Sequence, residues 1–141
     1  MRKIFFIIPV TLIVVFLVVL LSESPNQDEN FFHVTLANSN SYENGIFSKT
    51  IFFSQGNYFF KFVPNGSSPE KITIRLIGEN HDRNYEFFLK GNLQETGISE
   101  YYTWEYLGEN KIQIESDQNL KIEIDPNGQT NGSVSVYIKE N

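Results

Sequence analysis

Three aromatic side chains at alternate positions are the residues of this chain best suited to form a binding surface. Tyr102, Trp104 and Tyr106 stand two residues apart, so in a β-strand they would project from one face. A row of flat aromatic rings can stack on sugar rings, which indicates a carbohydrate platform. The alternative is that Trp104, the only tryptophan, anchors the hydrophobic core. We expect this structural role, with a cost of about 3–5 kcal/mol for Trp104→Ala.

Residues suited to catalysis are sparse. The histidines are His33 and His81, there is no cysteine, and no GxSxG, HExxH, GxGxxG or P-loop motif occurs. His33 falls in an apparent strand and is expected to point outward together with Thr35. The sequence therefore predicts no catalytic residue, no metal ligand and no cofactor. An enzyme is the remaining alternative.

Two polar segments resemble metal-binding loops in composition. Residues 79–84 contain Glu79, His81 and Asp82, but lack the further ligands that calcium or zinc would need. Residues 125–130 place glycine fourth, whereas an EF-hand loop places it sixth and ends in glutamate. We interpret the first segment as a solvated loop and the second as a hairpin turn.

Two N-x-[ST] sequons occur, at Asn65 and Asn131. Both fall in predicted turns of the segment that we expect outside the cell, which is the context that N-glycosylation requires. They are therefore candidate glycosylation sites in a host that has the machinery.

The amino-terminal region predicts a membrane segment. Residues 4–21 carry no charge, and Arg2 and Lys3 precede them. Eighteen helical residues rise about 27 Å, which nearly spans a bilayer core. We expect residues 1–22 to be a single-pass anchor, with a cleaved signal peptide as the alternative. The positive-inside rule places the amino terminus in the cytoplasm and the rest of the chain outside; cleavage would release a secreted domain.

Composition restricts the partners of the exported part. Without Arg2 and Lys3, nine of the 11 basic residues face 17 acidic ones. This excess of negative charge argues against nucleic acid as a partner. A polar linker at 23–30 would leave residues 31–141 as one extracytoplasmic domain close to the membrane.

Hydrophobic alternation with a period of two predicts an all-β domain. About nine strands are expected, among them 31–37, 47–53, 84–90 and 101–107, and Lys90-Gly91 is expected to end one of them. Alternating strands with one wet face are typical of antiparallel sheets. We therefore predict a two-sheet β-sandwich, Greek-key or jelly-roll-like, with Ile74, Ile114, Ile122 and Val136 facing inward.

The strand motif at 56–62 (GNYFFKF) and the hairpin motif at 124–128 (IDPNG) resemble those of small exported jelly-roll modules. The Golgi-dynamics (GOLD) and bacterial pre-peptidase carboxyl-terminal families contain such modules. The resemblance implies a non-catalytic module. Together with the anchor, it predicts an envelope-associated protein that binds a protein or glycan partner at the cell surface. A carbohydrate-binding module that uses the aromatic strip is the alternative.

Overall fold

The computed structural model describes residues 31–141. The predicted anchor at 1–22 and the linker at 23–30 lie outside the described residues. Within the described part of the chain, no helix is both long and apolar enough to cross a membrane.

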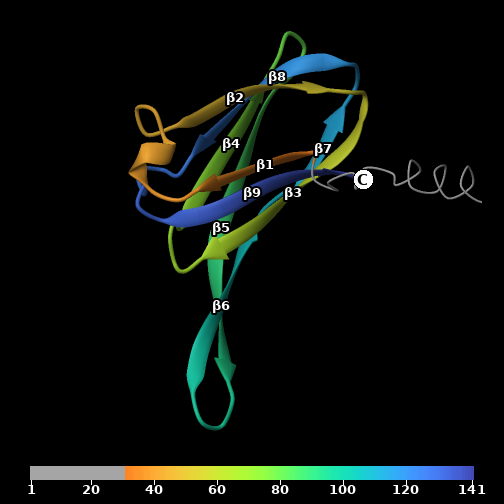
Figure 1. Ribbon diagram of the computed structural model, residues 1–141. Coiled ribbons are helices and arrows are strands. Elements are labelled where there is room, and N and C mark those ends of the chain that lie inside the picture. Colours follow the sequence, from red (N-terminus) through yellow and green to blue (C-terminus); the bar gives the residue numbers. More distant parts are fainter. Residues whose placement is uncertain (1–30) are drawn as a thin grey trace, which may run out of the picture.

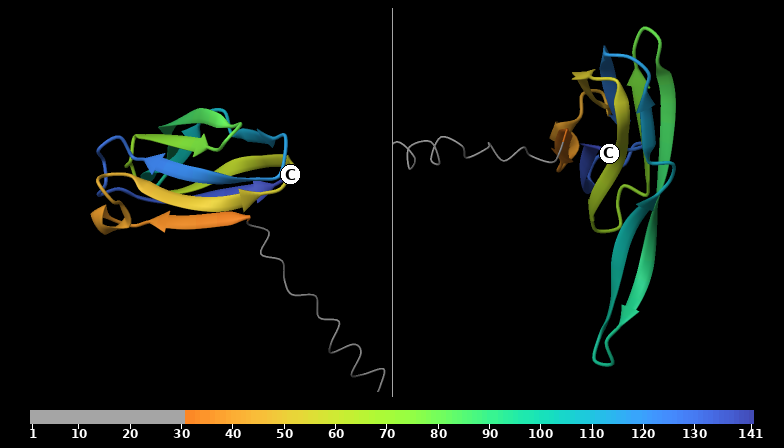
Figure 2. Two further views of the ribbon diagram at one scale, coloured as in Figure 1. Left: turned by 90° about the horizontal axis from the view of Figure 1, so that it is seen from above. Right: turned by 90° about the vertical axis from the view of Figure 1, so that its right-hand side faces the viewer.

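Nine antiparallel strands form two packed sheets, which confirms the predicted β-sandwich (Figures 1 and 2). The order is β1-β9-β3-β7 in one sheet and β2-β8-β4-β5-β6 in the other. The elements are β1 (Phe32–Leu36), η1 (Ser39–Ser41), β2 (Phe47–Phe53), β3 (Gly56–Asn65), β4 (Lys71–Ile77), β5 (Asp82–Glu95), β6 (Glu100–Leu107), β7 (Lys111–Ile114), β8 (Gln118–Asp125) and β9 (Ser133–Glu140). Among these strands, only the β4–β5 and β5–β6 connections join neighbours within one sheet.

The core lies between the sheets and follows the sequence alternation. Ile74, Ile114, Ile122 and Val136 are all buried, as predicted. Aromatic rings fill the space beside these aliphatic side chains: the Phe60 ring lies 5.4 Å from that of Phe87 in an edge-on arrangement. Because alternate residues of facing strands point into one layer, the period of two was sufficient to identify the core.

Two Asn-Gly pairs form turns with positive φ. Asn44 and Gly45 have φ of 52° and 84°, and Asn127 and Gly128 have φ of 53° and 85°. Two successive residues in the left-handed region are the signature of the tight turns that join antiparallel strands. The turn predicted at 125–130 is therefore present at Asn127-Gly128.

The β5–β6 hairpin projects beyond the sandwich as a two-stranded arm (Figures 1 and 2). β5 pairs with β4 only as far as Phe88, and beyond that residue it pairs with β6 as far as Glu95. The seven residues past Phe88 extend about 24 Å at the rise of an antiparallel strand. The prediction that Lys90-Gly91 ends this strand is wrong, because β5 continues through both residues.

Candidate binding site on the β5–β6 arm

One face of the arm continues the core-facing side of the larger sheet. Residues directly opposite each other in an antiparallel pair project from the same face. The inner face of the arm therefore comprises the cross-strand pairs Leu89–Tyr106, Gly91–Trp104, Leu93–Tyr102 and Glu95–Glu100. The sequence correctly predicted that Tyr102, Trp104 and Tyr106 share a face.

The outer face of the arm is mostly polar. Asn92 Nδ2 donates to Glu105 Oε1 at 2.8 Å, and Gln94 Nε2 donates to Thr103 Oγ1 at 3.4 Å. Such cross-strand hydrogen bonds stabilise a two-stranded ribbon that has no third strand to support it. The arm is thus amphipathic. Its apolar face points in the same direction as the core-facing side of the larger sheet.

The base of the inner face belongs to the core. The Tyr106 ring packs 5.1 Å from Phe62, and its hydroxyl donates to the Pro69 carbonyl oxygen at 2.6 Å. Burial, with a smaller contribution from Tyr42, raises the pKa of the Tyr106 phenol well above its usual value. Tyr106 therefore fixes the arm to the sandwich and is not an open stacking surface.

Trp104 lies outside the buried core, so its predicted role as the core anchor is wrong. It is half-buried and lies opposite Gly91. A Cβ at Gly91 would come within 2.7 Å of Trp104 Cζ3, so the indole occupies the space that a side chain at Gly91 would need. This packing explains why the glycine does not end β5: the ring covers the backbone that the glycine leaves open.

The outer part of the inner face is uncovered. Tyr102 is 57% exposed and Leu93, its cross-strand partner, is 46% exposed. The Tyr102 and Trp104 rings stack with centroids 5.7 Å apart and an interplanar angle of 28°. About half of the Tyr102 and Leu93 side chains is thus open to water, and such exposed apolar surfaces mark interaction sites.

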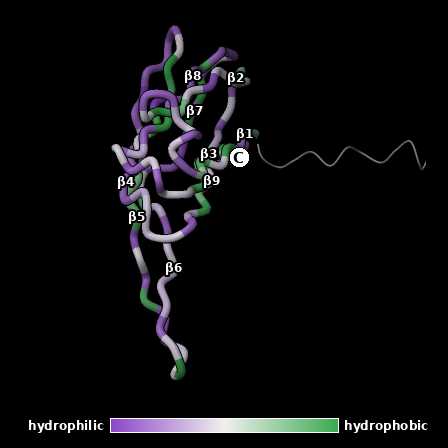
Figure 3. The backbone as a smooth tube through the Cα atoms, turned by 60° about the vertical axis from the view of Figure 1, so that its left-hand side comes forward, coloured by the Kyte–Doolittle hydropathy of each residue, from purple (hydrophilic) through white to green (hydrophobic). Residues whose placement is uncertain are grey.

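The tip of the arm combines an apolar residue with two carboxylates. Ile98 in the turn is 98% exposed, and a hydrophobic position at the end of the arm is visible in Figure 3. Glu95 and Glu100 lie directly opposite each other, a like-charge pair that destabilises the ribbon.

Sequence reasoning missed the contribution of β5 and the tip. Extending the alternation Phe87, Leu89, Leu93 through the glycine would have revealed it.

His33 behaves as an exposed strand residue, as predicted. Its ring stacks on Tyr137 at 4.3 Å, and its Nε2 lies 3.2 Å from Thr35 Oγ1. Thr35 Oγ1 in turn lies 2.9 Å from Ser135 Oγ. No carboxylate takes part in these contacts, so they lack the acid that would orient a catalytic histidine.

The loop predicted at 79–84 is shorter than expected, because β5 already begins at Asp82, and the Asp82 carboxylate forms an ion pair with Arg75. Asp82 accepts two hydrogen bonds from Arg75, at 2.9 and 2.6 Å, and these bonds lower the pKa of Asp82. Burial, followed by the charge of Arg83, lowers the pKa of the adjacent His81. Among residues 31–141, no three metal-ligating side chains gather into a group that could hold an ion.

Residues 125–130 form a turn, but the prediction of a hairpin is wrong, because the turn leads from β8 in one sheet to β9 in the other. Asp125 Oδ1 accepts the backbone N–H of Asn127 at 2.7 Å, and the Gln129 N–H donates to the Pro126 carbonyl at 3.1 Å. The aspartate oxygen thus satisfies the backbone of its own turn.

The two sequons lie side by side at one end of the β3–β9 pair. Asn131 is exposed in the turn before β9, as predicted, whereas Asn65 is exposed but is the last residue of β3 and does not lie in a turn. The register pairs Asn65 with Ser133, the third residue of the second sequon. Two glycans attached at these asparagines would therefore be neighbours.

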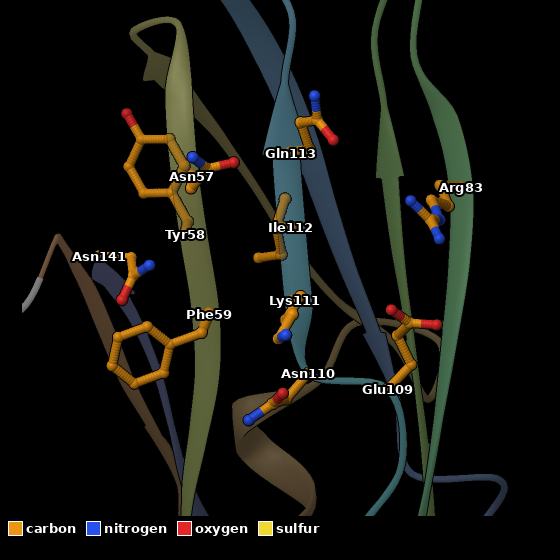
Figure 4. Close-up of a pocket in the computed structure, with 10 residues that line it drawn as sticks. All are labelled: Asn57, Tyr58, Phe59, Arg83, Glu109, Asn110, Lys111, Ile112, Gln113 and Asn141. Atoms are coloured by element: carbon orange, nitrogen blue, oxygen red, sulfur yellow. The ribbon is translucent and has the colours of Figure 1, made fainter.

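A depression of about 680 Å³ is lined by residues of β3, β5 and β7 (Figure 4). Arg83 and Glu109 lie on the side opposite Asn57 and Tyr58. Its lining contains no serine, threonine, cysteine or histidine, and the one hydroxyl there, that of Tyr58, donates to the Ser54 carbonyl oxygen at 3.0 Å. The arm therefore remains the best candidate for a functional site.

Comparison with models of known protein families finds no match to this chain, and comparison with curated protein sequences also finds none.

Proposed function

We propose that this protein is a non-catalytic interaction module at the outer surface of a membrane, and that the β5–β6 arm contacts its partner. The apolar inner face of the arm, on which Leu93 and Tyr102 are exposed beside the half-buried Trp104, is the observation that carries the proposal. A two-stranded ribbon without a covering layer gains little stability from its own contacts. An exposed apolar ribbon is therefore better explained by binding than by folding.

Photo-crosslinking from the two faces of the arm tests this proposal. A benzophenone amino acid replaces Tyr102 on the inner face or, as a matched control, Tyr101 on the outer face, in the full-length chain in its own cells. Both tyrosines are about half exposed. We expect a discrete crosslinked product from position 102 and none from position 101. Equal labelling from both positions, or from neither, would refute the proposal.

Carbohydrate binding is the second candidate, and the Tyr102–Trp104 stack favours it. Its platform is limited to two rings, because Tyr106 is packed against Phe62. Titrating the chain with a glycan panel while following the emission of Trp104, the only tryptophan, separates the candidates. We expect no shift with any glycan. A saturable shift of the Trp104 emission with one class of glycan would show that the arm binds carbohydrate and not protein.

The location is proposed from the sequence. Residues 1–22 form a retained anchor, the amino terminus is cytoplasmic and the sandwich is extracytoplasmic, with Asn65 and Asn131 available for glycosylation. The connections that cross between the sheets support the jelly-roll-like variant of the sandwich, and the resemblance to exported modules remains a prediction.

The intact mass of the native protein tests anchor retention. We expect a mass that includes residues 1–22, because the 18-residue apolar segment exceeds the usual length of a signal h-region. A mature chain that begins near Ser24 or Asn26 would contradict the anchor.

A further inference from the structure

The sandwich has four edge strands, and only one is both long and unprotected. β1 has five residues and β7 has four, while the seven-residue β2 carries Lys49. Short strands and lysines are common means of preventing an edge from pairing with another chain. β6 is the exception, because its eight residues contain no lysine and no proline, and its two charged residues, Glu100 and Glu105, would repel only an acidic partner.

Backbone groups of the inner-face residues point toward the free edge of β6. Leu89 donates its backbone N–H to the Glu70 carbonyl at 2.8 Å, on the side away from β6. Leu89 and Tyr106 are therefore a non-hydrogen-bonded pair of the β5–β6 ladder. Hydrogen-bonded and non-hydrogen-bonded pairs alternate along an antiparallel ladder, so every inner-face pair of the arm is of the non-hydrogen-bonded kind. The backbone N–H and C=O groups of these β6 residues point away from β5. The donors and acceptors of Glu100, Tyr102, Trp104 and Tyr106 therefore face outward, beside the aromatic side chains.

We infer that the free edge of β6 accepts an extended polypeptide segment as an added antiparallel strand, with apolar side chains on the inner face and a basic side chain opposite Glu100. The residues opposite Tyr106, Trp104 and Tyr102 would add to the apolar face, since directly opposite residues share a face. Strand addition to an exposed edge is a common mode of peptide recognition. The inference rests on the interaction function proposed above.

Charge at the tip of the arm selects a basic partner. Glu95 and Glu100 face each other across the ribbon, and the nearest base in the arm is Lys90, which lies opposite Glu105. A lysine or arginine of the added strand would place a positive charge beside two carboxylates. A second copy of this chain would bring a further net charge of −6. The charge therefore favours a different, basic segment over self-association.

A short synthetic peptide tests the inference directly. The probe alternates valine and threonine over six residues and ends in lysine, so that the valines meet Tyr106, Trp104 and Tyr102. It is titrated against the full-length chain in detergent micelles, with Trp104 emission as the readout. We expect saturable binding. Replacing the terminal lysine by glutamate should weaken it at least about fivefold, with a smaller difference in high salt.

Two further comparisons separate strand addition from nonspecific adhesion. N-methylation of a valine should abolish binding, because its N–H points at β6, whereas N-methylation of a threonine should leave binding intact. Tyr102→Ser should weaken binding, and Tyr101→Ser on the outer face should not. Glu100→Gln should remove most of the preference for lysine over glutamate.

Absent or non-saturable binding, equal effects of the two N-methylations, or equal effects of the two tyrosine variants would overturn the inference. If the chain instead associates with itself in a saturable way without peptide, the occupant of the β6 edge is a second copy of this chain and not a basic segment of another protein. If position 102 still crosslinks to a discrete partner while the peptides fail, the strand-addition inference falls and the interaction function stands.

Discussion

Replacement of Phe87 by alanine is expected to lower the free energy of unfolding by about 3–5 kcal/mol. Phe87 is 1% exposed, and its ring lies 4.5 Å from Phe62 and 5.4 Å from Phe60. Loss of the ring leaves a cavity between the two sheets, and the sheets cannot move together to fill it because the rest of the core holds them apart. Because small domains are stable by only about 5–15 kcal/mol, this variant should unfold at much lower urea concentration.

The neighbouring residue provides a matched control. Phe88 projects from the opposite face of β5 and is 53% exposed, with Lys71 Nζ 5.3 Å from its ring centroid. Phe88→Ala should cost less than about 1 kcal/mol. Trp104→Ala should also remain near 1 kcal/mol, because the indole covers Gly91 outside the core. Urea unfolding followed by circular dichroism would contradict the account if Trp104→Ala cost as much as Phe87→Ala.

Shortening the arm is expected to abolish partner binding. Asn-Gly replaces residues 91–104, so that Lys90 and Glu105, a hydrogen-bonded pair in the register, flank a two-residue turn. The change removes Leu93, Tyr102 and Trp104 together with the acidic tip. The partner identified by crosslinking from position 102 should no longer copurify with the full-length chain. A partner retained by the shortened chain would bind elsewhere on the sandwich.

The sequence predicted the strands because each has one buried and one wet face. Ile72, Ile74 and Leu76 are buried, for example, while Lys71, Thr73 and Arg75 between them are not. This pattern depends on neighbouring residues alone, so it can be recognised without knowing which strands pair. The predicted core and the turn at Asn127-Gly128 follow from the same kind of local rule.

The arm could not be recognised in the same way, because its properties depend on a contact across two strands. Gly91 taken alone indicates a break, and Trp104 taken alone indicates a core residue. Each is explained only when the register places them opposite each other. The closeness of Asn65 and Asn131 likewise results from the β3–β9 pairing, which joins parts of the chain far apart in sequence.

The unfolding free energy of the arm-shortened chain tests most directly whether the arm serves binding and not folding. The full-length and shortened chains are unfolded by urea in the same detergent and followed by circular dichroism. We predict that the two values agree within about 1 kcal/mol, because Tyr106, Phe87 and the rest of the core remain in place. A loss of more than about 3 kcal/mol would instead show that the arm is a structural part of the sandwich and not a binding element.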